Sequence, residues 1–226
     1  ELECHEHVHS HPNVLPILDC IWRQDDMFIV LEYCPDGDLF NALMRQNDSV
    51  ALTQWERERW VMTIFRDVLD SISWCHDNHI WHRDIKPENV LIAPDGRALL
   101  ADFGLATPYA QTLDHNIGSA FYMAPELLAV PGQAFGKEVI DSAKVDVWAL
   151  GVLLINMLYG RNPWASAHYT DTAFQIYLDR PEALREAFNL SEDGWFIIRR
   201  MLAIDPYERP TIKQVAAWIE SIKYWT

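Results

Sequence analysis

Apolar positions divide the chain into a β-rich beginning and a longer helical remainder. Val14–Trp22 and Met27–Leu31 are rich in β-branched and aromatic residues, and the polar stretch Arg23–Asp26 lies between them. This pattern predicts two strands joined by a turn. The residues before Val14 predict the end of a short helix, and from residue 53 onward helical spacing prevails.

The clearest predicted helix begins at Thr53. Thr53 and Glu56 form a capping-box pattern, in which each side chain hydrogen-bonds the backbone amide of the other residue. Apolar residues then recur at helical spacing and form one stripe: Trp60, Val61, Ile64, Phe65, Val68, Leu69 and Ile72. Such a stripe is typical of a helix packed on a core.

Three further elements follow from local signals. Asn89–Ala93 and Arg97–Ala101 predict a short hairpin, because Pro94-Asp95-Gly96 supplies the residues of a turn. Ala143–Tyr159 predicts a helix that is apolar almost all round and therefore buried on most faces. Thr211–Gln214 repeats the capping-box pattern and opens the last helix. A small mixed segment followed by a largely helical body indicates the α+β class.

Composition and charge narrow the function classes. The chain has 226 residues, 50% of them hydrophobic, with a formal net charge of −15. We therefore expect one large or two small globular domains and no nucleic-acid partner. The longest apolar run, Val147–Ile155, is too short to span a membrane, so we expect no membrane partner.

Cysteine usage points to a reducing compartment. Cys4, Cys20, Cys34 and Cys75 are widely spaced and form no C-x-x-C pair. A disulfide framework or a cysteine zinc site is not expected from such spacing. The expected location is cytoplasmic, nuclear or both.

An irregular segment between the predicted long helix and the predicted hairpin holds Asp84, Lys86 and Asn89. A carboxylate that accepts a hydroxyl proton, with a cation and an amide nearby, suits phosphoryl transfer, which depends on positioning and on charge neutralisation. Asp102-Phe103-Gly104 follows and supplies an oxygen ligand for Mg²⁺. Ala124-Pro125-Glu126 closes the stretch that begins at Asp102.

In this order and spacing, His82-Arg83-Asp84, Asp102-Phe103-Gly104 and Ala124-Pro125-Glu126 resemble the motifs of the eukaryotic protein kinases, serine/threonine class. The resemblance implies a protein-kinase-like α+β fold with a mostly helical C-terminal lobe. It assigns residues 1–33 to a remnant of the β-rich small lobe and 34–226 to the large lobe. The implied reaction transfers the γ-phosphate of ATP, with Mg²⁺, to serine or threonine hydroxyls of protein substrates.

The same resemblance assigns roles near the reacting atoms. Asp84 is implied as the catalytic base and Lys86 as the contact to the transferred phosphoryl group, a lysine that marks the serine/threonine class. Asn89 and Asp102 are implied as the Mg²⁺ ligands. Ser119 is implied to lie in the substrate-side loop, at a position where threonine is more usual.

For the nucleotide, the resemblance implies a hinge at residues 31–34. Leu31 would be the gatekeeper, and the backbones of Glu32 and Cys34 would face the adenine. Asp38 would contact the ribose, and Leu91 would form the floor of the pocket under the base.

Other residues resemble structural parts of the family. Asp146 is implied to anchor the catalytic loop from a buried helix, and Glu126 to form an ion pair with Arg209. Trp164, together with the long connection Leu127–Lys144, resembles fungal kinases that regulate nutrient response and meiotic entry.

Arg83 beside the base implies that the segment 102–126 presents a negative charge to it. In related kinases a phosphorylated threonine commonly lies three residues before the glycine that corresponds to Gly118, and here that position holds His115. Two alternatives remain open. The carboxylate of Asp114 supplies the charge, or Thr112 is the phosphorylated switch.

His5-Glu6-His7-Val8-His9 matches the H-E-x-x-H pattern of zinc proteases. Such a site needs a helix that continues past the second histidine, whereas Pro12 ends any helix here. We therefore predict the end of a helix with solvated histidines rather than a zinc site.

The chain departs from the family pattern at its start. It contains no G-x-G, and its first lysine is Lys86. We therefore expect the Gly-rich loop and the strand lysine to precede residue 1, with Glu1 or Glu3 as the glutamate of the regulatory helix. By itself this stretch is expected to be inactive and to self-associate. The alternative is a non-catalytic, kinase-like binding module.

Overall fold

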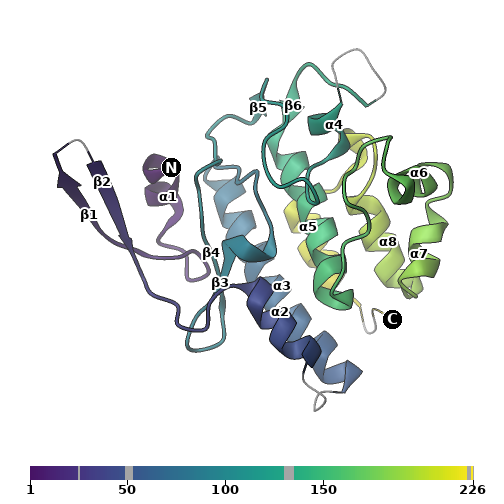
Figure 1. Ribbon diagram of the computed structural model, residues 1–226, viewed down its shortest axis with the longest axis horizontal. Helices are drawn as coiled ribbons and strands as arrows, with labels where there is room; N and C mark the ends of the chain where they lie inside the picture. Colours follow the sequence, from purple (N-terminus) through teal and green to yellow (C-terminus); the bar gives the residue numbers. More distant parts are fainter. Residues whose placement is uncertain (25, 49–52, 130–134, 223–224, 226) are drawn as a thin grey trace.

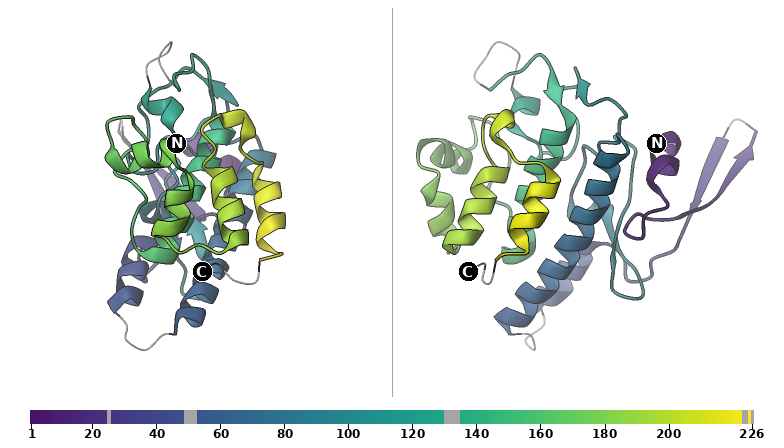
Figure 2. Two further views of the ribbon diagram at one scale, coloured as in Figure 1. Left: turned by 90° about the vertical axis from the view of Figure 1, so that its right-hand side faces the viewer. Right: turned by 180° about the vertical axis from the view of Figure 1, so that it is seen from behind.

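The N-terminal part of the chain holds a helix and a β-hairpin that projects from the other elements (Figures 1 and 2). The computed structural model describes residues 1–24, 26–48, 53–129, 135–222 and 225. Helix α1 spans Leu2–Val8, and strands β1 (Ile17–Arg23) and β2 (Asp26–Leu31) pair antiparallel. Both predicted strands are confirmed, although β1 begins at Ile17 rather than at Val14. Arg23 and Asp26 of the predicted turn belong to the strands, and residue 25 lies outside the described residues. Helix α1 ends before Pro12 is reached.

The hairpin leaves much of its apolar surface in solvent. Leu18, Trp22 and Phe28 are 63%, 68% and 52% exposed. In the register of the hairpin, Trp22 pairs with Met27 and Phe28 pairs with Ile21, so Trp22 and Phe28 lie on opposite faces and both faces expose apolar side chains. Exposed apolar side chains of this kind favour the self-association that the sequence predicts.

Helices α2 (Leu39–Asp48) and α3 (Gln54–Asp77) follow the hairpin. Helix α3 begins at the predicted capping box, in which Thr53 Oγ1 accepts from Glu56 N at 3.3 Å and Glu56 Oε2 accepts from Thr53 N at 2.9 Å. The sequence patterns did not predict α2. Its first turn is capped by Asp38 Oδ1, which accepts from Asn41 N at 2.7 Å.

Strands β3 (Val90–Ile92) and β4 (Ala98–Leu100) form the second predicted hairpin, with Val90 opposite Leu100. The hairpin packs on α3, whose Asp67 Oδ2 accepts from Ala98 N at 2.9 Å. It also ties down the N-terminal part, because Leu15 N donates to Leu100 O at 2.9 Å. The hairpin thus joins the beginning of the chain to the helical body.

Helix α5 (Ser142–Tyr159) lies at the centre of the helical body, as predicted, and almost all of its residues are buried. By length and composition it is apolar enough to cross a membrane, but 78% of that window is covered by the other elements, as in a core helix. Asp141 caps its start by accepting from Ala143 N at 3.0 Å. A Cβ at Gly151 would lie 2.9 Å from Leu202 Cδ2. Because Gly151 has no side chain, Leu202, which directly follows helix α8 (Glu192–Met201), can pack closely against α5.

Shorter elements complete the chain: η1 (Pro87–Asn89), β5 (Gln111–Thr112), α4 (Pro125–Leu128), β6 (Ile140–Asp141), α6 (Thr172–Asp179), α7 (Glu182–Ala187), α8 (Glu192–Met201), η2 (Pro206–Glu208) and α9 (Ile212–Ile219). The capping box predicted at Thr211 is present at the start of α9. Residues 130–134 of the long Leu127–Lys144 connection lie outside the described residues.

Candidate functional site

The segment 82–89 is held by a buried carboxylate of α5. Asp146 is fully buried, and its oxygens accept from His82 N at 3.0 Å and from Arg83 N at 2.7 Å. A third group, His76 Nε2, lies 2.9 Å from Asp146 Oδ2. These bonds hold Arg83 in its left-handed conformation (φ 64°). Asp146 therefore occupies the anchoring position predicted for it.

Four predicted site residues meet around one carboxylate. Asp84 Oδ2 accepts from Lys86 Nζ at 2.6 Å and from Asn89 Nδ2 at 3.0 Å. Asp84 Oδ1 accepts from Ser119 Oγ at 2.9 Å, and Lys86 Nζ lies 2.9 Å from the same hydroxyl. The cluster offers a carboxylate that takes a proton from a hydroxyl and an ammonium group that neutralises charge beside it.

Gly118 makes the position of Ser119 possible. Its φ is +98°, a conformation that favours glycine, and a Cβ there would lie 2.9 Å from the carbonyl oxygen of Arg83. The substrate-side loop can therefore approach the segment 82–89 closely only with glycine at this position.

The two predicted Mg²⁺ ligands lie on adjoining segments. Ala101 N donates to Asn89 O at 2.9 Å, which holds Asp102 beside Asn89. The Asn89 amide nitrogen bonds Asp84, so its Oδ1 remains available, and Asp102 is exposed with one oxygen accepting from Gly104 N at 3.1 Å. No group of three or more His, Cys, Asp or Glu residues suits a metal within the described part of the chain. Two oxygen ligands fit Mg²⁺ that is completed by phosphate and water.

Phe103 lies between two histidine rings. His5 stacks on it with centroids 4.5 Å apart, and His82 meets it edge-on at 5.1 Å. His5 is buried, and its Nε2 lies 2.7 Å from Leu15 O. The prediction of solvated histidines is thus wrong for His5, because Phe103, far along the chain, covers it. Burial lowers the pKa of His5.

The structure separates the two candidate glutamates of α1. A Cβ at Gly104 would lie 3.7 Å from Glu1 Oε2, so Glu1 lies beside the segment 102–104. Glu3 instead lines a cavity with Asn78 and His79. The geometry therefore favours Glu1 for the regulatory-helix role.

The predicted hinge lies against the β3–β4 hairpin. Leu31, Cys34 and Leu91 belong to one apolar cluster with Leu15, Ala93, Leu99 and Ala101. Within the described residues no partner bonds the Glu32 carbonyl or the Cys34 amide. An unpaired donor and acceptor above an apolar surface fit the edge of an adenine ring.

Asp38 has a structural contact that the sequence analysis did not foresee. Its Oδ1 accepts from both the backbone and the side-chain amide of Asn41, at 2.7 and 2.9 Å, and caps α2. The ribose contact implied by the family resemblance remains a prediction, in which the other oxygen of this half-buried carboxylate takes part.

Of the two residues in the regulatory alternatives, Asp114 contacts Arg83 in the structure. Arg83 Nη1 lies 2.7 Å from Asp114 Oδ2, and Arg83 Nε donates to Leu105 O at 2.7 Å. The Thr112 hydroxyl instead contacts the backbone, because its Oγ1 accepts from Asp114 N at 3.4 Å. The carboxylate of Asp114 therefore occupies the position of the expected negative charge.

The predicted structural pair is present on the far side of α5. Arg209 donates twice to the buried Glu126 carboxylate, at 2.6 and 2.8 Å, and its guanidinium lies 4.8 Å from the Trp148 ring centroid. Trp164 is buried beside Trp148, with centroids 5.6 Å apart. These residues serve packing rather than the reacting atoms.

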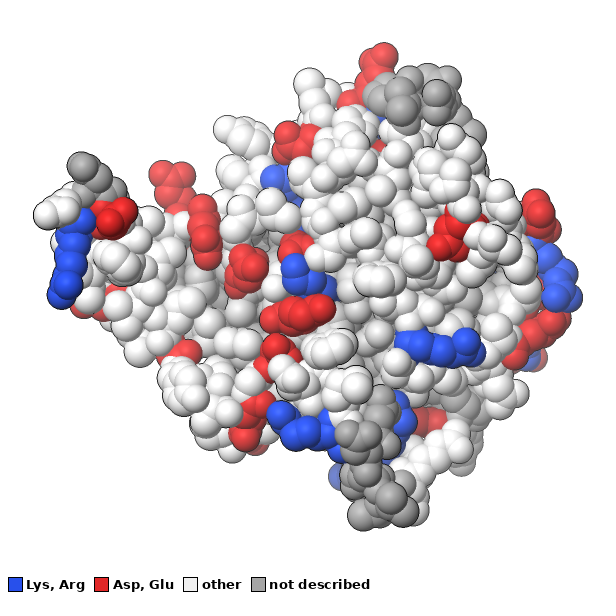
Figure 3. Space-filling model, viewed as in Figure 1, with Lys and Arg blue, Asp and Glu red and all other residues white. Residues whose placement is uncertain are grey.

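Acidic side chains gather between the hairpin and the helical body on the face in Figure 3. The exposed or half-buried carboxylates of the site are Glu1, Glu32, Asp36, Asp38, Glu88 and Asp102. Such a surface repels a polyphosphate, so a divalent cation is needed between the two.

The family description "Protein kinase domain" matches residues 1–218. The chain belongs to the protein kinase family. Members of this family generally use ATP and Mg²⁺. The predicted kinase-like α+β fold is confirmed.

Curated relatives match the whole chain. "Serine/threonine-protein kinase KSP1" of Saccharomyces cerevisiae is 33% identical over 232 residues, and this chain covers 21% of it. "Negative regulator of sexual conjugation and meiosis" of Schizosaccharomyces pombe is 31% identical over 243 residues, and this chain covers 51% of that protein. The chain thus spans between a fifth and a half of the length of these relatives. The predicted resemblance to fungal serine/threonine kinases is confirmed.

Two residues with clear contacts at the site were missed from sequence. His76 shares Asp146 with the segment 82–89, and His5 stacks on Phe103. Neither has a neighbour in the sequence that signals its contact, because the partners lie far along the chain. His5 was instead read as part of a false zinc pattern.

Proposed function

We propose that this domain transfers the γ-phosphate of ATP to serine and threonine hydroxyls of proteins. The observation that supports this most is the cluster around Asp84, in which Lys86, Asn89 and Ser119 all bond one carboxylate. The relatives named as serine/threonine kinases support the same activity.

In the proposed reaction, Asp84 accepts the proton of the substrate hydroxyl. Lys86 neutralises charge on the transferred group, and Ser119 holds the substrate-side loop against both residues. Asn89 and Asp102 would hold Mg²⁺, which would neutralise phosphate charge when bound. The hinge atoms of Glu32 and Cys34 would orient the adenine.

We also propose that the kinase needs no phosphorylation of Thr112. Asp114 already pairs with Arg83, and a carboxylate there supplies part of the charge that a phosphate would bring.

We further propose that the substrates are proteins and that the location is cytoplasmic or nuclear. Four free cysteines suit such a reducing location.

A purely non-catalytic binding module is less consistent with the cluster. A docking surface has no physical need for a hydrogen-bonded Asp84–Lys86–Asn89 arrangement next to an exposed Asp102. A binding module would also function without the carboxylate of Asp84, whereas the proposed kinase would not.

The test compares variants of the full-length protein that contains this chain. Asp84→Ala should lower phosphate transfer to serine and threonine peptides by about 10²–10⁴-fold, while ATP binding persists. Asp95→Ala is the matched control, because Asp95 is an exposed carboxylate that bonds Arg97 on the β3–β4 turn. Wild-type transfer rates in Asp84→Ala would rule out the assignment of the base.

A further inference from the structure

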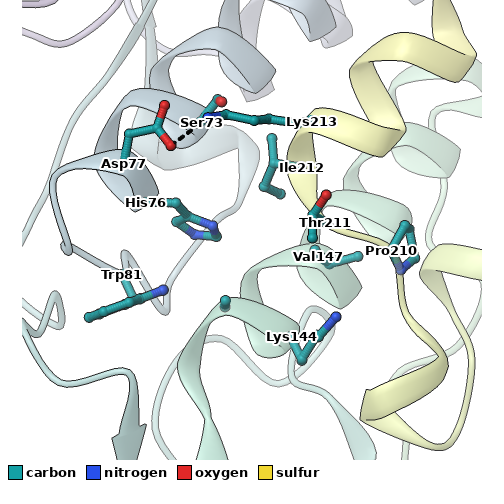
Figure 4. A pocket seen from close by; sticks show the side chains of 11 residues that line it. Ser73, His76, Asp77, Trp81, Lys144, Val147, Pro210, Thr211, Ile212 and Lys213 are labelled. Carbon is teal, nitrogen blue, oxygen red and sulfur yellow. Dashed lines mark ion pairs between the residues drawn. The ribbon is translucent and has the colours of Figure 1, made fainter.

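A cavity of about 320 Å³ lies behind the segment 82–89, where α3 ends and where α5 and α9 begin (Figure 4). This volume is at the lower end for small-molecule sites. Among its lining residues only His76 contacts the site described above, through Asp146. The lining residues are Ser73, His76, Asp77, Trp81, Ala143, Lys144, Val147, Pro210, Thr211, Ile212 and Lys213.

Trp81 presents a polar group to this cavity. The residue as a whole is only 8% exposed, but its indole N–H is not among the buried polar atoms without a partner and is reached by solvent in the open cavity. Figure 4 shows the ring nitrogen at the end of the indole that faces the cavity. Because this N–H opens into the cavity, it is available to donate to an acceptor that enters.

The charge of the lining favours an anion. Lys213 pairs with Asp77 at 2.7 Å, whereas Lys144 donates to the carbonyl of Arg209 at 2.6 Å and has no carboxylate within ion-pair distance in the described part. In Figure 4 Lys144 lies across the cavity from Trp81. Val147 and Ile212 add apolar wall between them. The lining therefore suits an apolar body that carries a negative acceptor.

The walls of the cavity are bonded to the catalytic segments. His76 lies 2.9 Å from Asp146, which holds the amides of His82 and Arg83. Trp81 directly precedes this segment, and its backbone exchanges two hydrogen bonds of 3.0 Å with Thr107. A ligand that fixes these walls would restrict both segments.

We propose that this cavity binds a small carboxylate with an apolar or aromatic body, and that its occupancy orders the segment 82–89. The carboxylate accepts the Trp81 N–H and faces Lys144, while the apolar body lies between Val147 and Ile212. Binding stands independently of the proposed kinase activity, and only an effect on phosphate transfer rests on that function.

The first experiment titrates cinnamate into the full-length protein by calorimetry. Saturable binding at one site is expected. Trp81→Phe, which keeps a ring but removes the donor, should weaken binding about tenfold. Trp74→Phe is the matched control, because Trp74 lies on α3 against His11 outside the cavity, and it should bind as wild type. Ser73→Leu, which fills the cavity, should abolish binding.

Thermal unfolding checks that each variant is folded, and Trp81→Phe and Ser73→Leu serve as independent tests. No saturable binding to wild type, or equal binding by a folded Ser73→Leu variant, would overturn the site. Equal binding of the neutral analogue cinnamamide would overturn the anionic class.

The second experiment measures amide hydrogen exchange with and without cinnamate. The amides of residues 82–89 should exchange more slowly when cinnamate is bound to wild type but not in Ser73→Leu. Unchanged exchange with cinnamate bound would overturn the coupling. Failure of the proposed kinase function would look different, since phosphate transfer would be absent while cinnamate binding remained.

Discussion

The surroundings of α5 and the β1–β2 hairpin are both rich in apolar residues, but these residues are buried around α5 and largely exposed on the hairpin. Around α5, apolar burial surrounds charged groups that are bonded, such as Asp146 and the Glu126–Arg209 pair, while the indole N–H groups of Trp148 and Trp164 are buried without a partner. The hairpin instead exposes Trp22 and Phe28 and holds no buried ion pair among its described residues.

The two regions differ in how closely burial fixes the positions of their polar groups. Low-dielectric packing strengthens hydrogen bonds and penalises unpaired polar groups, so the α5 region permits one arrangement of the catalytic segment. The hairpin lacks this constraint, because side chains on both of its faces are exposed.

The largest effect should come from breaking the buried ion pair. Arg209→Met leaves the Glu126 carboxylate buried without its partner and should lower the free energy of unfolding by about 3–5 kcal/mol. Arg180→Met breaks the exposed Arg180–Glu186 pair and should cost at most about 1 kcal/mol. Urea unfolding of both variants measures the difference. Equal losses would contradict the contrast between buried and exposed charges.

The regulatory pair lies between these extremes, since Arg83 is nearly buried and Asp114 is 56% exposed. Asp114→Asn should lower the phosphate-transfer rate about tenfold, because the neutral amide no longer neutralises Arg83. Thr112→Ala should leave the rate close to that of wild type, and phosphatase treatment of wild type should do the same. If phosphatase or Thr112→Ala silences the enzyme and Asp114→Asn does not, Thr112 is the switch.

His5 connects α1 to Phe103, and its protonation gives a pH test. Burial lowers the pKa of His5 in the folded state, so below about pH 6.5 the unfolded chain binds a proton that the folded chain does not. Stability should therefore fall as the pH falls below that value, by at most about 1.4 kcal/mol per pH unit for this group.

His5→Leu should flatten this slope in chemical unfolding measured between pH 7 and about pH 5. Part of the slope should remain, because burial also lowers the pKa of His11. His7→Leu is the control, since His7 is exposed. A slope that is unchanged in His5→Leu would refute the buried neutral histidine.

The smallest effect on stability should come from the exposed apolar side chains on the two faces of the hairpin. The double variant Trp22→Ser, Phe28→Ser should change the free energy of unfolding by no more than about 0.5 kcal/mol, because both side chains are exposed. It should nevertheless reduce self-association of the 226-residue chain, measured by light scattering. Trp55→Ser removes an exposed tryptophan elsewhere and should reduce association less. A double variant that still associates like wild type would show that another surface is responsible.

Local sequence patterns determined much of the architecture and the chemical core of the site. The capping boxes at Thr53 and Thr211 and the turn Pro94–Gly96 act between near neighbours, so their outcome needs no tertiary contact. The segment with Asp84, Lys86 and Asn89 could also be predicted, because these residues lie close together in the sequence. Helix α2 was missed, since its ten residues carry few distinctive signals.

Only the tertiary structure decided contacts between distant parts of the chain. It placed Asp114 rather than Thr112 on Arg83, and Glu1 rather than Glu3 beside Gly104. It also buried His5 against Phe103, where a sequence pattern had indicated solvent. In each case neighbouring residues of similar chemistry compete for one position. The choice depends on which side chain the packed backbone directs toward it, and a linear sequence does not contain that direction.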